Sequence, residues 1–205
     1  MVAPHLTDEV RPLVSPVPAT LQLVDRPSED GPASVFEKLS TRLTSELAEE
    51  LYGAAEWLGV RIEEILLAAL GRALGRTRGE GALAVDVIGP TGPPIQCVAL
   101  MCSAAPAMGP TEMLQGAHTA LAGPVGSAGA PSQVLLNLTA NRNESGGHHV
   151  LELRVLELRV SGDASELQLD WWYDTRSLDP YSVEELAEQF PRALIEITSD
   201  AAPPL

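Results

Sequence analysis

The amino-acid sequence predicts an α+β domain in which a single mixed β-sheet has helices packed on one face. Three segments, near 44–58, 61–76 and 182–198, repeat apolar residues every three or four positions, as amphipathic helices do. Between and after them stand segments that alternate apolar and polar residues or form short apolar runs, as strands do. The predicted order is helix, helix, strand, strand, helix, strand, strand, strand, helix.

The first two predicted helices follow each other closely. Thr44 is the expected N-cap of the helix at 44–58, and Gly59 stands where a helix C-cap residue is common. The helix at 61–76 has a broad apolar face, which predicts that most of its surface is buried.

The last predicted helix, 182–198, has a capping box formed by Ser182 and Glu185. Pro191 lies inside this helix and is expected to bend it, because proline cannot donate the backbone hydrogen bond of its position. A shorter helix is predicted at 112–122, after Pro110.

The predicted strands are buried or half-buried, and they occupy 82–88, 95–104, 133–139, part of 150–160, and 165–173. The sequence LELRV occurs twice within 150–160, with its apolar residues in opposite phase. A β-bulge between Val155 and Leu156 would return both copies to one face of the sheet. Gly162 and Asp163 then predict a hairpin turn.

The two ends of the chain differ from its centre. Residues 1–35 are rich in proline and predict an extended arm, part of which lies against a surface through its apolar residues. The domain itself is expected at 36–198, and 199–205 is expected to be a flexible tail.

Charge and composition exclude several classes of function. The net charge of −15 disfavours binding to nucleic acid and to anionic membranes. No apolar run is long enough to span a bilayer, and the N-terminus does not resemble a signal peptide. Cys97 and Cys102 lie five residues apart in a predicted strand, so a disulfide between them is not expected. These features predict a cytoplasmic protein.

Several segments, taken in order, resemble the C-terminal lobe of the condensation and epimerization domains of nonribosomal peptide synthetases, which have the chloramphenicol-acetyltransferase-like fold. The resemblance covers about 20–198. It is carried by LQLVDRP, by the helical stretch LTSELAEELYGAAEWLGVRIEEILLAALGRALGR, by ALAVDVIGPTG, by VALMCSAAPA with Pro106, by VLLNLT with Asn137, and by SELQLDWWYDTRSLDPYSVEELAEQF.

The resemblance implies that the catalytic H-H-x-x-x-D-G motif belongs to an N-terminal lobe outside this stretch. His148 and His149 imitate it, but no Asp-Gly pair follows them, so a polar loop end is the favoured interpretation. At the position of the epimerization glutamate stands Ile88, which cannot transfer a proton. Pro90 and Gly92 replace the histidine and arginine of the same motif.

The resulting hypothesis is a non-catalytic half-domain that serves as a protein-interaction or scaffold element in nonribosomal peptide biosynthesis. The alternative is one subunit of a split condensation enzyme, completed by a separate histidine-bearing N-terminal lobe. A third hypothesis is a segment of a larger synthetase. No catalytic residue, cofactor or metal site is predicted.

The expected partner is a synthetase component, a carrier protein, the complementary lobe or a second copy of the chain. The densest basic cluster, Arg72, Arg76 and Arg78 at the end of the second helix, is the candidate partner-binding site. The alternative is that these arginines interact with the C-terminus of their own helix and keep the protein soluble.

Overall fold

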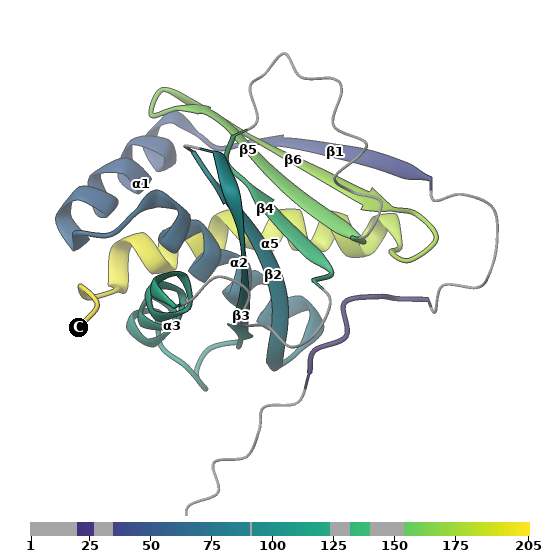
Figure 1. The fold of residues 1–205 in the computed structure, drawn as a ribbon. Helices are drawn as coiled ribbons and strands as arrows, with labels where there is room; N and C mark the ends of the chain where they lie inside the picture. Colours follow the sequence, from purple (N-terminus) through teal and green to yellow (C-terminus); the bar gives the residue numbers. More distant parts are fainter. Residues whose placement is uncertain (1–19, 27–34, 91, 124–131, 140–153) are drawn as a thin grey trace, which may run out of the picture.

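The computed structural model describes residues 20–26, 35–90, 92–123, 132–139 and 154–205. These residues form one sheet and its covering helices (Figure 1). In chain order the elements are β1 (Phe36–Arg42), α1 (Ser45–Leu58), α2 (Ile62–Arg78), β2 (Gly81–Gly89), β3 (Gly92–Cys102), α3 (Pro110–Ala122), β4 (Val134–Asn137), β5 (Leu156–Asp163), β6 (Glu166–Asp174) and α5 (Pro180–Asp200).

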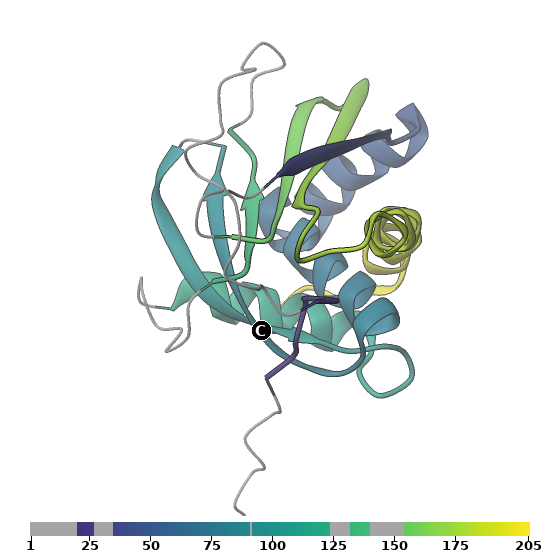
Figure 2. The same cartoon turned by 90° about the vertical axis from the view of Figure 1, so that its right-hand side faces the viewer.

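The six-stranded sheet is mixed, with the strand order β1-β6-β5-β4-β2-β3. The central pairs β2–β4 and β4–β5 are parallel, and the outer pairs are antiparallel. Figure 2 shows the sheet on one side and the helices α1, α2 and α5 together on the other. The predicted fold class is therefore confirmed.

The core lies between this face of the sheet and the helices. Leu66 and Leu70 of α2 are fully buried in it, and the Trp171 ring of β6 meets the Phe190 ring of α5 edge-on with 5.5 Å between centroids. The whole Trp171 side chain is removed from water, so it is a large apolar contribution to this contact. One hydrophobic cluster thus joins strands and helices from both ends of the chain.

The caps of α1 agree with the sequence, and the cap of α5 does not. The backbone N–H of Leu47 donates to Thr44 Oγ1 at 3.3 Å, and Gly59 ends α1 with a φ of 67°. Helix α5 begins at Pro180 instead of after Ser182, because Asp179 accepts a hydrogen bond from the Tyr181 backbone N–H at 3.1 Å. Proline fits the first helical position, where its missing N–H leaves nothing unpaired.

Strand β1 was not predicted. Its sequence FEKLSTR is mostly polar, and Leu39 is the one residue of β1 that packs against the core. The strand forms because it pairs with β6 along its whole length, from Phe36 opposite Asp174 to Arg42 opposite Gln168. Pairing at the edge of a sheet demands little apolar surface, so the hydrophobic pattern is weak there.

Part of the predicted arm and the C-terminal tail contact the domain. Leu21 and Leu23 are buried in the core, and the Leu21 backbone N–H donates to the Ala82 oxygen at 2.8 Å. The backbone N–H of Ala202 donates to Thr111 Oγ1 at 3.0 Å, which attaches the tail to α3. The proposed domain boundaries themselves stay a prediction, and the first LELRV copy lies largely outside the described residues.

Helix α2 approaches the end of β3 so closely that side chains are excluded at two positions. A Cβ atom on Gly75 would lie 2.2 Å from the Ser103 carbonyl carbon, and one on Gly71 would lie 2.7 Å from the Met101 oxygen. Both neighbours are backbone atoms, which cannot rotate away as a side chain could. The absence of a side chain therefore determines how deeply α2 packs.

We expect Gly75→Ala to destabilise the fold by about 1–3 kcal/mol, because the added methyl group forces α2 away from Ser103. Gly53→Ala is the matched control, since a Cβ atom there has nothing within 4 Å. In an open helix position this exchange should stabilise by about 0.5–1 kcal/mol. Urea unfolding followed by circular dichroism measures both, and equal effects of the two exchanges would contradict the close approach.

Candidate functional site

The candidate functional site is the face of the sheet opposite the core. Strand pairing aligns two rows of side chains across this face. The first row runs Lys38, Trp172, Glu157, Leu135, Asp86, Cys97, and the second runs Ser40, Asp170, Arg159, Asn137, Ile88. None of these residues belongs to the hydrophobic cluster that the helices cover. We call the two rows the polar face.

Glu157 stands at the centre of the polar face and is 0% exposed. Arg159 binds both of its carboxylate oxygens, with Nε 2.6 Å from Oε1 and the second nitrogen 3.1 Å from Oε2. Asn137 Nδ2 also donates to Glu157 Oε1 at 3.0 Å. A buried carboxylate requires such partners because it has lost its hydration. Glu157 is therefore held in a fixed orientation.

The Trp172 ring has two cations against it. The Arg159 guanidinium carbon lies 5.0 Å from the ring centroid, and Lys38 Nζ lies 5.6 Å from it. Both distances are within the range of cation–π attraction. Together with the Glu157 contacts they join β1, β5 and β6 through side chains on this face. The result is a patch of ordered aromatic and charged groups.

Asp170 continues this patch toward β1. Its carboxylate accepts a hydrogen bond from Ser40 Oγ at 2.6 Å and lies 3.6 Å from Lys38 Nζ. Burial raises the pKa of Asp170, but hydrogen bonds from Ser40 and Gln168 and the charge of Lys38 outweigh it, so the pKa lies below its ordinary value. The group is ionised at neutral pH and acts as an acceptor.

At the other end of the polar face, Asp86 is paired with Arg154. Arg154 Nε donates to Asp86 Oδ2 at 2.9 Å. Cys97 lies opposite Asp86 on the neighbouring strand. Burial, together with the hydrogen bond to Asp86, raises the pKa of Cys97 to about 11. The thiol is protonated at neutral pH and is a poor nucleophile.

Ile88 ends the second row beside Asn137, and it is 8% exposed. Asn137 Oδ1 accepts hydrogen bonds from Thr139, at 3.0 Å from the backbone nitrogen and 2.8 Å from the hydroxyl. The position where the resemblance would place an acid–base glutamate thus holds an aliphatic side chain. Since the carboxylates of Asp86, Glu157 and Asp170 all lie against cations, the face is suited to recognition more than to proton transfer.

Three further features bear on function: the histidine pair, metal binding and membrane insertion. His148 and His149 lie outside the described residues. Within the described ranges, no group of three or more histidine, cysteine or acidic residues is placed to hold a metal ion. None of the helices in the same ranges combines the length and apolar content that a membrane span requires.

The structure places Arg72, a predicted partner-binding residue, inside the protein. Its side chain is 0% exposed and donates to the carbonyl oxygens of Ser103 at 2.8 Å and Met108 at 2.5 Å. It also lies 3.0 Å from Glu196 Oε1 on α5. The sequence suggested a surface cluster because arginine is rarely buried, but α2 is enclosed and Arg72 has carbonyl and carboxylate partners there.

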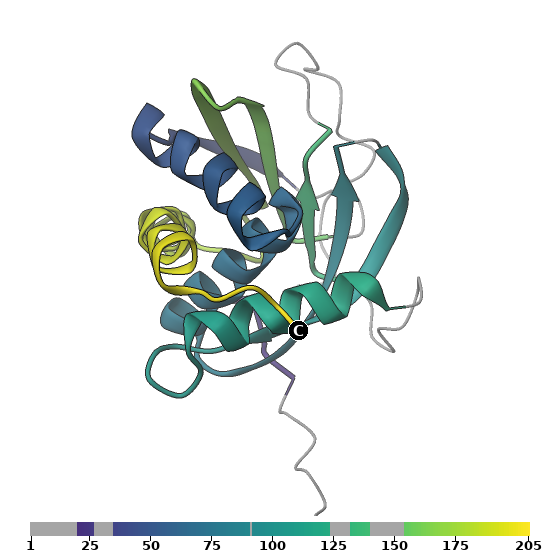
Figure 3. The same cartoon turned by 90° about the vertical axis from the view of Figure 1, so that its left-hand side faces the viewer.

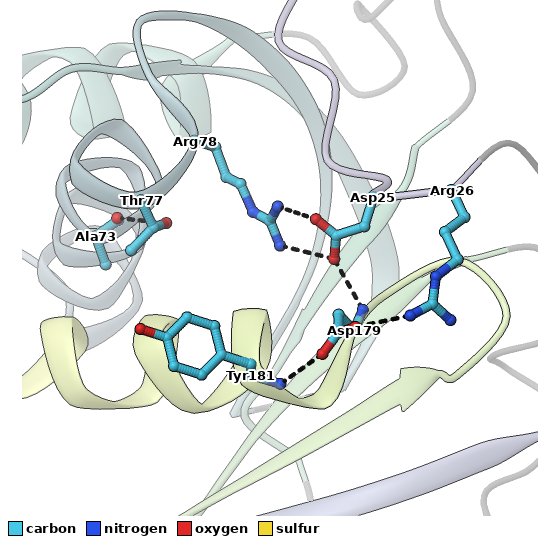
Figure 4. A network of polar contacts seen from close by, with 7 residues as sticks. All are labelled: Asp25, Arg26, Ala73, Thr77, Arg78, Asp179 and Tyr181. Atoms are coloured by element: carbon cyan, nitrogen blue, oxygen red, sulfur yellow. Dashed lines mark hydrogen bonds and ion pairs between the residues drawn. The ribbon is translucent and has the colours of Figure 1, made fainter.

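Arg76 and Arg78 are partly exposed and are also paired within the chain. Arg76 binds Glu196, and Arg78 binds both carboxylate oxygens of Asp25 (Figure 4). A partner-binding role for these two arginines stays a prediction. Such a role would have to compete with the internal ion pairs.

The Arg78 pair attaches the N-terminal segment to two helices. Asp25 Oδ2 also accepts the Asp179 backbone N–H at 2.8 Å, at the start of α5, and Arg26 lies 2.7 Å from Asp179 Oδ2 (Figure 4). Burial raises the pKa of Asp25, but the bonds from Arg78 and Asp179 outweigh it and the pKa is lowered. The network joins the end of α2, the start of α5 and the segment before β1.

Arg72→Glu should destabilise the protein by about 3–5 kcal/mol, because it places a buried carboxylate against the partly exposed one of Glu196 and removes the donors to two carbonyl groups. Arg42→Glu is the control, since that side chain is 71% exposed and its ion pair contributes about 0–1 kcal/mol. Thermal and urea unfolding measure both variants. Near-parental stability of Arg72→Glu would mean that the site is open to solvent.

Ile88 and Asn137 were already of interest from the sequence, but the polar face as a unit was not predicted. A signal was present, because Glu157 and Arg159 alternate with leucines, and Asp86 interrupts an apolar strand. Alternation shows that these residues share a face with polar character. Which residues become neighbours across the sheet depends on the order of the strands, and the alternation within one strand does not reveal that order.

No family model matches the chain. Among curated proteins, it is 29% identical over 226 aligned positions to one subunit of the phenolphthiocerol/phthiocerol polyketide synthase of Mycobacterium tuberculosis (strain CDC 1551 / Oshkosh). The same figures hold for the corresponding protein of Mycobacterium bovis (strain ATCC BAA-935 / AF2122/97). The alignments cover 82% of this chain and 15% of the relatives, so the chain spans a small part of their length.

Solved structures are similar over most of the chain. The epimerization domain from the third module of tyrocidine synthetase B matches with a TM-score of 0.70 and 14% identity, over 90% of this chain and 52% of that one. The X-domain from teicoplanin biosynthesis matches with 0.66 and 16% over the same shares. The first condensation domain of the CDA synthetase gives 0.61 and 18%, over 84% and 48%. The chain therefore has the fold of about half of a condensation- or epimerization-type domain.

Proposed function

We propose that this chain is a non-catalytic condensation-type lobe that makes a protein contact in the biosynthesis of a nonribosomal peptide or polyketide. The observation that carries the proposal is Ile88, which stands on the polar face where the resemblance would place the epimerization glutamate. Without an ionisable group there, the face can bind and orient a partner but has no proton to exchange at this position.

The arrangement of the sheet supports a contact through the polar face. The helices cover the other face and bury one hydrophobic cluster, whereas the side of the polar face near β1 reaches solvent, since Lys38 is exposed and Trp172 is partly exposed. Trp172, Arg159 and Lys38 are ordered by mutual contacts. Preorganised aromatic and arginine side chains are the groups that most often dominate the free energy of protein association.

The partner we propose is a component of a synthetase assembly: a carrier protein, the complementary lobe or a second copy of the chain. Similarity to half of several solved synthetase domains and to a stretch of a polyketide synthase protein supports this class of partner. A location in the cytoplasm fits the acidic composition and the two free cysteines.

A second function is a condensation enzyme in two pieces, in which a separate histidine-bearing N-terminal lobe supplies the chemistry. The specific observation in its favour is the TM-score of 0.70 to an epimerization domain of which the chain covers 52%. In this case the polar face would meet the second lobe, and activity would appear only in the mixture.

Trp172→Ala should weaken binding to a purified partner by about tenfold or more, because truncating an aromatic anchor in an interface often costs at least 1–2 kcal/mol. Trp57→Ala is the matched control, since Trp57 is 70% exposed on the opposite, helical side of the molecule. Titration calorimetry with carrier proteins or N-terminal lobes from the same gene neighbourhood gives the affinities. A loss confined to the Trp57 variant would place the contact on the helices instead.

The chain alone should show no peptide-bond formation and no exchange of the α-proton on carrier-bound aminoacyl substrate. The reasons are that this sequence holds no H-H-x-x-x-D-G motif and that Ile88 offers no acid or base at that site. Mass spectrometry of substrate incubated in deuterated water measures the exchange, and an intact epimerization domain is the positive control.

Turnover above background by the chain alone would contradict this proposal. If His148→Ala or His149→Ala abolished that turnover, the histidine pair would be catalytic. Turnover that appears only after an N-terminal lobe is added would support the two-piece enzyme.

A further inference from the structure

A groove lies beside α3, outside the polar face. It has a volume of about 530 Å³ and is formed by the outer side of α3, by Ala99 of β3, and by Pro203 and Leu205 of the C-terminal tail. Figure 3 shows the tail leaving α5, running beside α3 and ending next to it. We call this hollow the α3 groove. Its size is within the range of about 300–1,000 Å³ that is usual for ligand sites.

The tail shows how α3 holds an extended chain. Thr111 Oγ1 accepts the backbone N–H of Ala202 at 3.0 Å, and Gln115 Oε1 accepts that of Leu205 at 2.6 Å. Thr111 and Gln115 are four residues apart and therefore lie on one face of the helix. Both contacts are made to backbone groups, so these two side chains hold the tail through its backbone.

The same row continues past the tail. Thr119 is the next position on this side of α3, and it lines the groove. Its Oγ1 accepts a hydrogen bond from Gln115 Nε2 at 3.2 Å. Gly116 and Ala120 lie next to it, and no heavy atom stands within 4 Å of where a Gly116 Cβ would be. Small residues leave space for an apolar side chain of a bound segment.

The opposite wall favours an extended segment as well. Strand β3 is the last strand of the sheet, and within the described ranges it pairs with β2 on one side only. An extended peptide can hydrogen-bond to such an edge, as in β-strand addition. Glu112 lines the groove with a carboxylate and is exposed, so a basic side chain of the segment would be attracted there.

We propose that the α3 groove binds an extended peptide segment of a partner protein, which carries an apolar side chain next to a lysine or arginine. The apolar side chain lies over Gly116 and Ala120, the basic one reaches Glu112, and the backbone passes Thr119 and Ala99, beyond the positions that the tail occupies. The tail forms one wall of the site. This inference does not depend on the function proposed for the polar face.

The test is a titration of the full chain by NMR with the peptide acetyl-Ala-Leu-Ala-Lys-Ala-amide. We expect saturable shifts at Gly116, Thr119 and Ala99. The peptide with glutamate in place of lysine should bind about threefold to fivefold more weakly, because losing one exposed charge pair changes the affinity by at most about fivefold. Equal binding of the two peptides, or shifts outside the groove only, would overturn the proposal.

Gly116→Leu should weaken binding of the lysine peptide about tenfold, since nothing lies within 4 Å of a Cβ atom there and the larger side chain would occupy the groove. Gly53→Leu is the matched control, because its Cβ position on α1 is equally open, and it should bind as the parent does. Glu112→Gln should remove the preference for lysine, with Glu188→Gln on α5 as its control. Parental binding by both Gly116→Leu and Glu112→Gln would exclude the groove as the site.

Discussion

The close packing of α2 against the end of β3 is the constraint on which the rest of the structure depends. Gly71 and Gly75 bring the helix backbone against Met101 and Ser103. Arg72, between them, is then enclosed, and it hydrogen-bonds to carbonyl groups of the segment that follows β3 and to Glu196 of α5. A single turn of one helix thus positions the sheet, the segment leading to α3 and the last helix. Because Arg72 is buried, its role is structural, although the sequence suggested a surface residue.

The two faces of the sheet have different chemistry for a physical reason. One face meets helices and excludes water, so its strand positions are apolar. The other carries Glu157, Arg159 and Trp172 in mutual contact, with each charge neutralised by a neighbour. Such a surface is ordered before any partner arrives, which lowers the entropy lost on association. Because position 88 holds no ionisable group, this face can bind a partner but cannot transfer a proton there. The proposed function rests on this difference.

Much of the fold could be predicted from local patterns. Periodicity and residue types with strong local preferences predict the helices α1 and α2, the caps at Thr44 and Gly59, and the strands of the sheet other than β1. The predictions failed where a neighbour far away in the sequence decides the outcome. Strand β1 forms through pairing with β6, and the start of α5 is determined by Asp179, which also binds Arg26 and donates its backbone N–H to Asp25.

The sequence by itself determined the alternation of apolar residues, and hence most of the elements, the fold class and the absence of an acid–base group at position 88. These depend on each residue and its near neighbours along the chain. The tertiary structure alone decided which charges meet: Arg72 with Glu196, Arg78 with Asp25, and Glu157 with Arg159 and Asn137. It also decided that the tail lies along α3 and completes a groove. Contacts of this kind depend on strand order and helix packing, which bring together residues that the sequence keeps far apart.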